Sequence, residues 1–313
     1  MKGSLALLAK CAVSVTLLAI LIWQTDVDRV KAVLATTSPG WLAAALACYG
    51  VMVLASVWRW GQLLVAMPAA IPHRTLLQSF LVAVFFNNFL PSNVGGDIVR
   101  VRDTSKPLGS ATAATLVVGL DRLLGLLGLL VIAAIAASAA AIDGEIAPPL
   151  PPIMLWLALA GVTALTGVLL LSPQRLTALL RPFGRLGNEW VGQRIARTHD
   201  VLEQISGQPS ALLRCFAGAL VVQVVLIVFY AAIARAIDLQ VPLVHLAVLV
   251  PVSFLVQMLP VSVNGFGVRE AVFSYYLASL RLPLEAAFAF SLLGAATVLV
   301  FSLSGAVVYL LRR

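Results

Sequence analysis

The chain reads Asn87-Asn88-Phe89-Leu90-Pro91-Ser92-Asn93-Val94-Gly95-Gly96-Asp97-Ile98-Val99-Arg100, a polar and glycine-rich stretch between long apolar segments. A second stretch lies 169 positions further on and reads Leu259-Pro260-Val261-Ser262-Val263-Asn264-Gly265-Phe266-Gly267-Val268-Arg269. Both contain Leu-Pro, four residues, a glycine, three residues and an arginine. Proline and glycine interrupt a continuous helix, so each stretch predicts a break between two helical segments.

The composition is that of a membrane protein. Hydrophobic residues make up 61% of the chain, charged residues 11%, and the mean hydropathy is +1.02. Soluble domains carry about twice this share of charged residues, so the sequence predicts an all-α, polytopic membrane protein. We assign the formal net charge of +8 to cytoplasmic loops and anionic lipid rather than to nucleic-acid binding, because aromatic stacking residues in a basic groove are absent.

Apolar and polar segments alternate in a way that divides the chain into four parts. The longest hydrophilic segment, 172–210, is rich in arginine, which predicts a cytoplasmic loop containing an amphipathic helix on the membrane surface. The four parts are a transmembrane helix with an external loop (1–39), a first repeat (40–142), a connecting span with the basic cytoplasmic loop (143–210) and a second repeat (211–313).

The two repeats are predicted to have opposite orientations in the membrane. Adding 169 to each apolar segment of the first repeat gives an apolar segment of the second. The arms 75–90 and 245–259 are shorter than the roughly 20 residues that a crossing requires, so we expect each to be part of a re-entrant helical hairpin. Six crossings then remain, which places both termini in the cytoplasm and makes the units inverted-topology repeats, an architecture typical of secondary transporters. The alternative is that the second arm and the segment after it are two full crossings, which leaves the orientation of the termini unchanged.

The two motifs carry groups that suit an anion. Pro91 and Pro260 end the helical arms. The helix that starts after each glycine group presents free N–H groups and a positive dipole end. Arg100 and Arg269 add planar guanidinium groups that match phosphate oxygens. The alternative is that these arginines only hold the hairpins, by pairing with acidic residues, because an unpaired charge at bilayer depth is unfavourable.

Other polar residues in apolar surroundings leave two interpretations open. Arg59, between two tryptophans, is either an interfacial anchor that reaches water or a headgroup contact. Asp121 and Arg122 either face the substrate or form an ion pair at a helix end, and Asn88 and Gln257 either line the cavity or hydrogen-bond between helices. The candidate substrate-binding residues are Arg59, Asn88, Pro91, Ser92, Gly95, Gly96, Asp97, Arg100, Asp121, Arg122, Gln257, Pro260, Asn264, Gly265, Gly267, Arg269 and Glu270.

Three ordered motifs resemble a known family. They are Asn88-Phe89-Leu90-Pro91 with Gly95-Gly96-Asp97 and Arg100, Asp121-Arg122 with Gly125, and Leu259-Pro260 with Gly265-Phe266-Gly267-Val268-Arg269-Glu270. This pattern is similar to the flippase-like membrane family that includes the transmembrane region of lysylphosphatidylglycerol synthase. The resemblance implies a multi-pass protein of the bacterial inner membrane that moves a lipid between leaflets, with aminoacylated phosphatidylglycerol, polyprenyl-phosphate-linked lipids or hopanoid-related lipids as candidates.

Two departures from the family pattern limit what is carried over. Asn264 stands where a glycine is expected, so the second hairpin is expected to differ in geometry. The soluble aminoacyl-transferase domain of the synthase has no counterpart in this sequence, so we do not expect lysine transfer.

The leading hypothesis is a lipid translocator that is not an enzyme and uses no metal or cofactor. One alternative is an integral-membrane lipid-modifying transferase, but its acidic cluster, Asp97, Asp103 and Asp121, is outnumbered by basic residues and suits an anion better than a metal ion. Another is a non-transporting partner that binds a lipid-synthesis enzyme through 172–210. Association of the chain into a homo-oligomer is a further alternative.

Overall fold

A computed structural model describes residues 2–89, 95–143, 150–171, 189–259, 261–263 and 265–312. Every regular element among them is an α-helix, which confirms the predicted fold class. The helices are α1 (Lys2–Gln24), α2 (Val27–Ala35), α3 (Pro39–Val65), α4 (His73–Phe89), α5 (Gly95–Ser105), α6 (Ala111–Asp143), α7 (Pro152–Leu171), α9 (Glu189–Ser206), α10 (Pro209–Ala236), α11 (Leu243–Gln257), α12 (Val268–Ser279) and α13 (Leu284–Leu311).

The protein is a multi-pass membrane protein. Within the described residues, five helices are long and apolar enough to cross a bilayer, namely α3, α6, α7, α10 and α13. A sixth crossing is present if α1 and α2, which meet at an angle of 87°, form one broken span. The predicted external loop after the first span therefore contains a helix, because the Asp26 carboxylate accepts hydrogen bonds from the N–H groups of Asp28 and Arg29 and caps it.

The helices of the two repeats correspond in order and length. In the first repeat α3, α4, α5 and α6 have 27, 17, 11 and 33 residues, and in the second α10, α11, α12 and α13 have 28, 15, 12 and 28. Each motif thus lies between two short helices that precede a long one. The described bounds agree with the 169-residue offset inferred from the sequence.

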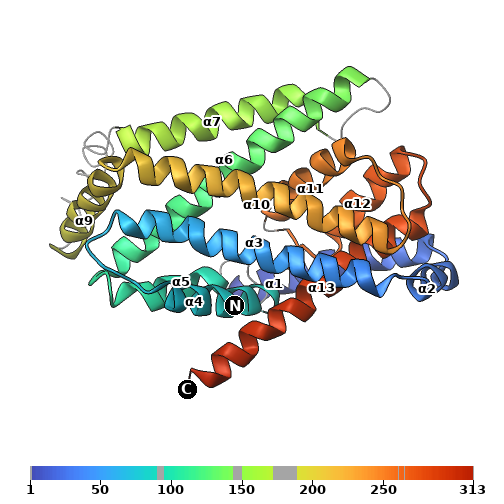
Figure 1. Ribbon diagram of the computed structural model, residues 1–313, viewed down its shortest axis with the longest axis horizontal. Helices are drawn as coiled ribbons and strands as arrows, with labels where there is room; N and C mark the ends of the chain where they lie inside the picture. Colours follow the sequence, from blue (N-terminus) through green and yellow to red (C-terminus); the bar gives the residue numbers. More distant parts are fainter. Residues whose placement is uncertain are drawn as a thin grey trace.

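The equivalent helices α3 and α10 pack side by side in antiparallel directions (Figure 1). The N–H of Ser38, before α3, donates to the carbonyl of Ala236, the last residue of α10, at 2.8 Å. Further along, Tyr49 of α3 meets Phe229 of α10 with ring centroids 5.7 Å apart. The α4–α5 pair lies toward one end of α3 and α10, and the α11–α12 pair toward the other (Figure 1). This is the packing that inverted repeats require, and the orientation of the repeats and hairpins in a membrane stays a prediction.

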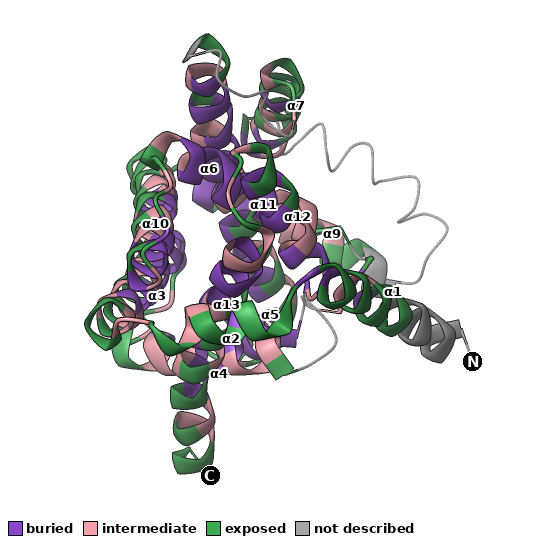
Figure 2. Cartoon of the chain, turned by 90° about the vertical axis from the view of Figure 1, so that its right-hand side faces the viewer, coloured by how far each residue is buried: buried purple, intermediate pink, exposed green. Residues whose placement is uncertain are grey.

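Burial is greatest along the helices that meet in the middle of the molecule. Buried residues gather on α6, α10 and α11, whereas much of α7 and the end of α13 are exposed (Figure 2). The main core combines small and aromatic residues. Phe229, Tyr230, Phe273 and Phe290 pack in mutual edge-on or tilted contacts with centroids 4.9–5.6 Å apart. Such packing rather than water exclusion holds helices together in lipid.

Both motifs contain glycines that the local structure requires. A side chain at Gly96, in α5, would collide with the carbonyl oxygen of Ala83 in α4, so glycine there allows the two arms to approach closely. Gly265 and Gly267 have φ angles of +75° and +82°, a backbone conformation that other residues rarely adopt. A Cβ atom at Gly265 or Gly267 would also come within 3.0 Å of neighbouring atoms, so the second motif needs both backbone freedom and space.

Several sequence-based expectations lie outside the described residues. These are the roles of Pro91, Ser92, Pro260 and Asn264, and the lipid-facing residues expected within 172–188. The helix expected in the cytoplasmic loop is described from Glu189 onward as α9.

Candidate functional site

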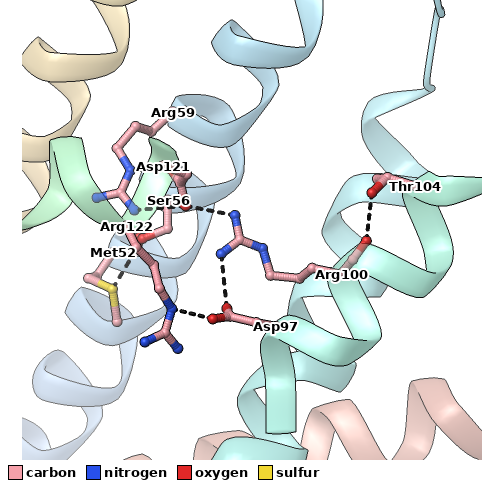
Figure 3. Close-up of polar contacts among 8 residues, drawn as sticks. All are labelled: Met52, Ser56, Arg59, Asp97, Arg100, Thr104, Asp121 and Arg122. Atoms are coloured by element: carbon pink, nitrogen blue, oxygen red, sulfur yellow. Dashed lines mark hydrogen bonds and ion pairs between the residues drawn. The ribbon is translucent and has the colours of Figure 1, made fainter. Parts of the chain in front are cut away.

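A cluster of charged side chains, of which Arg122 alone is exposed, joins the first motif to the long helices (Figure 3). Asp121 of α6 is fully buried, at 0% exposure, and accepts hydrogen bonds from Arg59 Nε and Nη2 at 2.8 and 3.1 Å. Arg100 Nη2 donates at 2.7 Å to Asp121 Oδ2, the oxygen that also accepts Arg59 Nη2. Arg100 also lies 3.6 Å from Asp97, which pairs in turn with Arg122. The cluster contains three guanidinium groups and two carboxylates, and so carries one net positive charge.

Space for this cluster is made by small residues on two helices. A side chain at Gly125 of α6 would come within 3.0 Å of the Arg59 guanidinium, and one at Gly218 of α10 would meet the Arg59 side chain at the same distance. The Arg100 guanidinium stacks over the fully buried Trp60 ring at 4.4 Å from its centroid. Stacking and ion pairing together compensate the unfavourable burial of these charges.

This geometry corrects one interpretation of the sequence. Arg59 is buried and bonded to Asp121, so it is not an interfacial anchor that reaches water, although its neighbour Trp58 is exposed. Asp121 and Arg122 lie inside α6 rather than at its end, and each pairs with a residue of another helix. The pairing expected under the hairpin-holding alternative is therefore present in the first motif.

In the second motif the arginine pairs with its own neighbour. Arg269 donates to Glu270 Oε1 from Nε at 3.0 Å and from Nη2 at 2.5 Å. The other Glu270 oxygen accepts the Gly267 N–H at 2.7 Å, and Ser291 of α13 lies 3.5 Å from Oε1. The offset of 169 places Phe290 and Ser291 where the first repeat has Asp121 and Arg122. Since the long helix lacks an acidic residue there, Glu270 supplies the carboxylate.

A cavity of about 310 Å³ lies between the two repeats. Asn87 and Asn88 at the end of α4 line it from the first motif, and Gln257 and Arg269 line it from the second. Gln223 of α10 contributes a further amide, and most of the other lining residues are apolar or aromatic. Polar groups from both motifs thus converge on one cavity inside apolar helices.

Asn87 connects the cavity to the charged cluster. Its side chain lines the cavity, and its Oδ1 accepts the N–H of Gly96 at 2.7 Å, one residue before Asp97. The N–H groups of Gly96 and Gly267, which precede the helix-start amides that the sequence suggested for anion binding, already have side-chain acceptors. These two amides are therefore not free to bind a substrate.

A family model for the lysylphosphatidylglycerol synthase transmembrane region matches residues 7–305, nearly the whole chain. The chain belongs to this family. The resemblance inferred from the three motifs is thereby confirmed, and with it a lipid-related role in a membrane. No curated protein matches the chain.

In this member of the lysylphosphatidylglycerol synthase transmembrane region family, the predicted site residues divide into two groups. Asn88, Gln257 and Arg269 line the cavity, whereas Arg59, Asp97, Arg100, Asp121 and Arg122 form the charged cluster. Their roles toward a substrate stay predictions. Sequence reasoning missed Asn87 and Gln223. The signal for Gln223 was its place as the one polar residue in the apolar run 215–233, since polar groups inside membrane helices mark candidate sites.

Proposed function

We propose that this protein moves a phosphate-bearing lipid between the two leaflets of the bacterial inner membrane. The observation that carries the proposal is the cavity between the repeats, with polar groups from both motifs and the guanidinium of Arg269 on its wall. A lipid headgroup crossing a bilayer must exchange water for other polar partners, because an unsatisfied polar group in hydrocarbon is unfavourable by several kcal/mol. A cavity with these side chains supplies such partners midway between the two hairpins.

The two groups of residues would have different tasks in this movement. Arg269 would bind a phosphate oxygen while it remains oriented by Glu270. The charged cluster would hold α5 against α3 and α6 and keep the first hairpin in place, because the buried Asp121 bonds to arginines of both α3 and α5. The acyl or isoprenoid chains would remain in lipid, so only the headgroup needs a polar path.

The pairing of the acidic residues favours a translocator over the transferase alternative. Asp121 and Glu270 each accept several hydrogen bonds from arginine or backbone groups. A carboxylate that is fully engaged with arginine is a poor ligand for a divalent metal or a poor general base. We further propose that both termini lie in the cytoplasm, with the hairpin α4–α5 entering from that side.

The test is leaflet-resolved labelling of lipid in proteoliposomes that contain the purified protein. We expect the wild type to expose an inner-leaflet phosphodiester lipid to an external reagent faster than protein-free vesicles do. Arg269→Ala should remove most of this acceleration, whereas Arg214→Ala, which removes an exposed arginine from α10, should not. Lipid redistribution at the protein-free rate with every lipid offered would overturn the proposal.

A further inference from the structure

The amide of Gln223, which lines the cavity, has an oxygen atom without a hydrogen-bond donor among the described residues. It is only 7% exposed, and its Oε1 has no hydrogen-bond partner among the described residues. It projects from the middle of α10, with valines on either side in the sequence, into the wall of the cavity. Buried amide oxygens are nearly always hydrogen-bonded, so this oxygen indicates a polar occupant.

The other amides of the cavity are already engaged. Asn88 donates to the carbonyl of Val84 at 3.0 Å, and Gln257 to that of Ser253 at 3.0 Å. Asn87 accepts the Gly96 N–H. These three side chains are hydrogen-bonded within the hairpin arms. Gln223 differs from them, because its amide oxygen is available to accept a hydrogen bond from a ligand in the cavity.

The charges around the cavity decide what kind of occupant fits. Arg269 is the charged side chain among the described lining residues, and no described carboxylate lines the wall. Glu270, which is next to it, is 2% exposed and already binds Arg269 and the Gly267 N–H. A cationic headgroup would therefore meet a guanidinium and neutral amides without a carboxylate to pair with it, which is unfavourable in a buried site.

We propose that the cavity selects a headgroup that joins one anionic phosphodiester to a small uncharged hydroxyl-bearing group, with Arg269 binding the phosphate and Gln223 the hydroxyls. The inference deepens the proposed function by naming the substrate class. The volume of about 310 Å³ is near the lower end of ligand sites, which span about 300–1,000 Å³. One phosphate with a polyol or a single sugar is of this size, and an oligosaccharide is not.

The experiment measures binding of individual lipids to the purified protein in detergent by native mass spectrometry. Phosphatidylglycerol has the phosphodiester and hydroxyls, phosphatidylethanol has the same charge without hydroxyls, and lysyl-phosphatidylglycerol adds a cationic group. We expect the wild type to prefer phosphatidylglycerol over each of the others by about tenfold, the effect of leaving one buried polar group unpaired. Soluble glycerol phosphate is the fourth compound, and it tests whether the site binds the headgroup without the lipid chains.

Two substitutions separate the parts of the proposal. Gln223→Leu should bind phosphatidylglycerol and phosphatidylethanol equally, because it removes the amide and keeps the volume similar. Gln223→Glu should shift the preference toward lysyl-phosphatidylglycerol, because it supplies the missing carboxylate. The matched controls are Gln62→Leu and Gln62→Glu in α3, at a half-buried position outside the described cavity lining, and they should keep the wild-type preference.

An unchanged preference in Gln223→Leu would overturn the inference, since water alone would then account for the open amide. Displacement of phosphatidylglycerol by equimolar glycerol phosphate would overturn the assignment to a lipid headgroup. A wild type that moves no lipid but shows the Gln223-dependent preference would refute translocation and leave this inference standing. If the wild type moves lipid but Gln223→Leu keeps the wild-type lipid preference, translocation is supported and this inference is refuted.

Discussion

Arg100 and Asp121, which are 21 residues apart in the sequence, are joined by a 2.7 Å hydrogen bond between Nη2 and Oδ2. This bond ties α5, the second arm of the first hairpin, to the long helix α6. Because Asp121 also binds Arg59 of α3, a single buried carboxylate connects three helices. The position of the first hairpin therefore depends on one ionisable residue inside an apolar helix.

Asp121→Asn should strongly destabilise the protein. The substitution removes the negative charge between two buried guanidinium groups, and breaking one partner of a buried pair typically lowers the free energy of unfolding by about 3–5 kcal/mol. The measurement is thermal unfolding in detergent, with Asp28→Asn as control, because Asp28 makes only an exposed pair with Lys31. An equal Tm for the two variants would contradict the proposed role of Asp121.

Arg269 and Glu270 allow the substrate role and the structural role to be separated. Arg269→Ala alone should lower stability, because it leaves the buried Glu270 carboxylate without its cation. In the double variant Arg269→Ala/Glu270→Gln the charge is removed and the Gly267 N–H keeps an acceptor, so we expect most of the stability to return. Lipid movement should remain at least about tenfold below wild type in both variants, the effect of losing one charge-assisted contact.

The decisive readout for Arg269 is the comparison of thermal stability with transport in the double variant. Recovery of both would assign Arg269 to holding the hairpin only. Recovery of stability without transport would support contact with the substrate, which is the result we expect from its place on the cavity wall.

Gly96→Ala should impair packing of the first hairpin. A methyl group at Gly96 would press against the backbone of Ala83 and the side chain of Asn87, and overpacking of this kind destabilises proteins by about 1–3 kcal/mol. Gly161→Ala in α7 is the matched control, because a methyl group there meets open space and alanine favours helix. In thermal unfolding, the Tm should fall below that of the wild type for Gly96→Ala and should not fall for Gly161→Ala. A Gly96→Ala protein as stable as the control would show that the two arms do not pack this closely.

The sequence could predict the helical membrane fold and the position of both helix breaks, because these follow from local apolar length and from proline and glycine. It could not predict which residues would share a site. In the sequence, the two neighbouring tryptophans make Arg59 look like an interfacial anchor. Only the packing of α3 against α6 brings it into contact with Asp121, which is 62 residues away. Equivalent arginines of the two motifs also differ in surroundings, since Arg100 pairs across helices and Arg269 pairs with its neighbour.

The last prediction concerns the two ends of the molecule. Helix α5, which ends just before Lys106, and helix α12, which ends at Ser279, lie toward opposite ends of the α3–α10 pair (Figure 1). Arg312 contacts Asp103 at 3.0 Å, so the C-terminal end of α13 lies on the same side as Lys106. In a protein whose Cys11, Cys48 and Cys215 are replaced, Lys106→Cys should react with an impermeant maleimide only from the cytoplasmic side. Ser279→Cys should react only from the outside. Reaction of both cysteines from one side would rule out inverted repeats, because hairpins of opposite orientation must open toward opposite faces of the membrane.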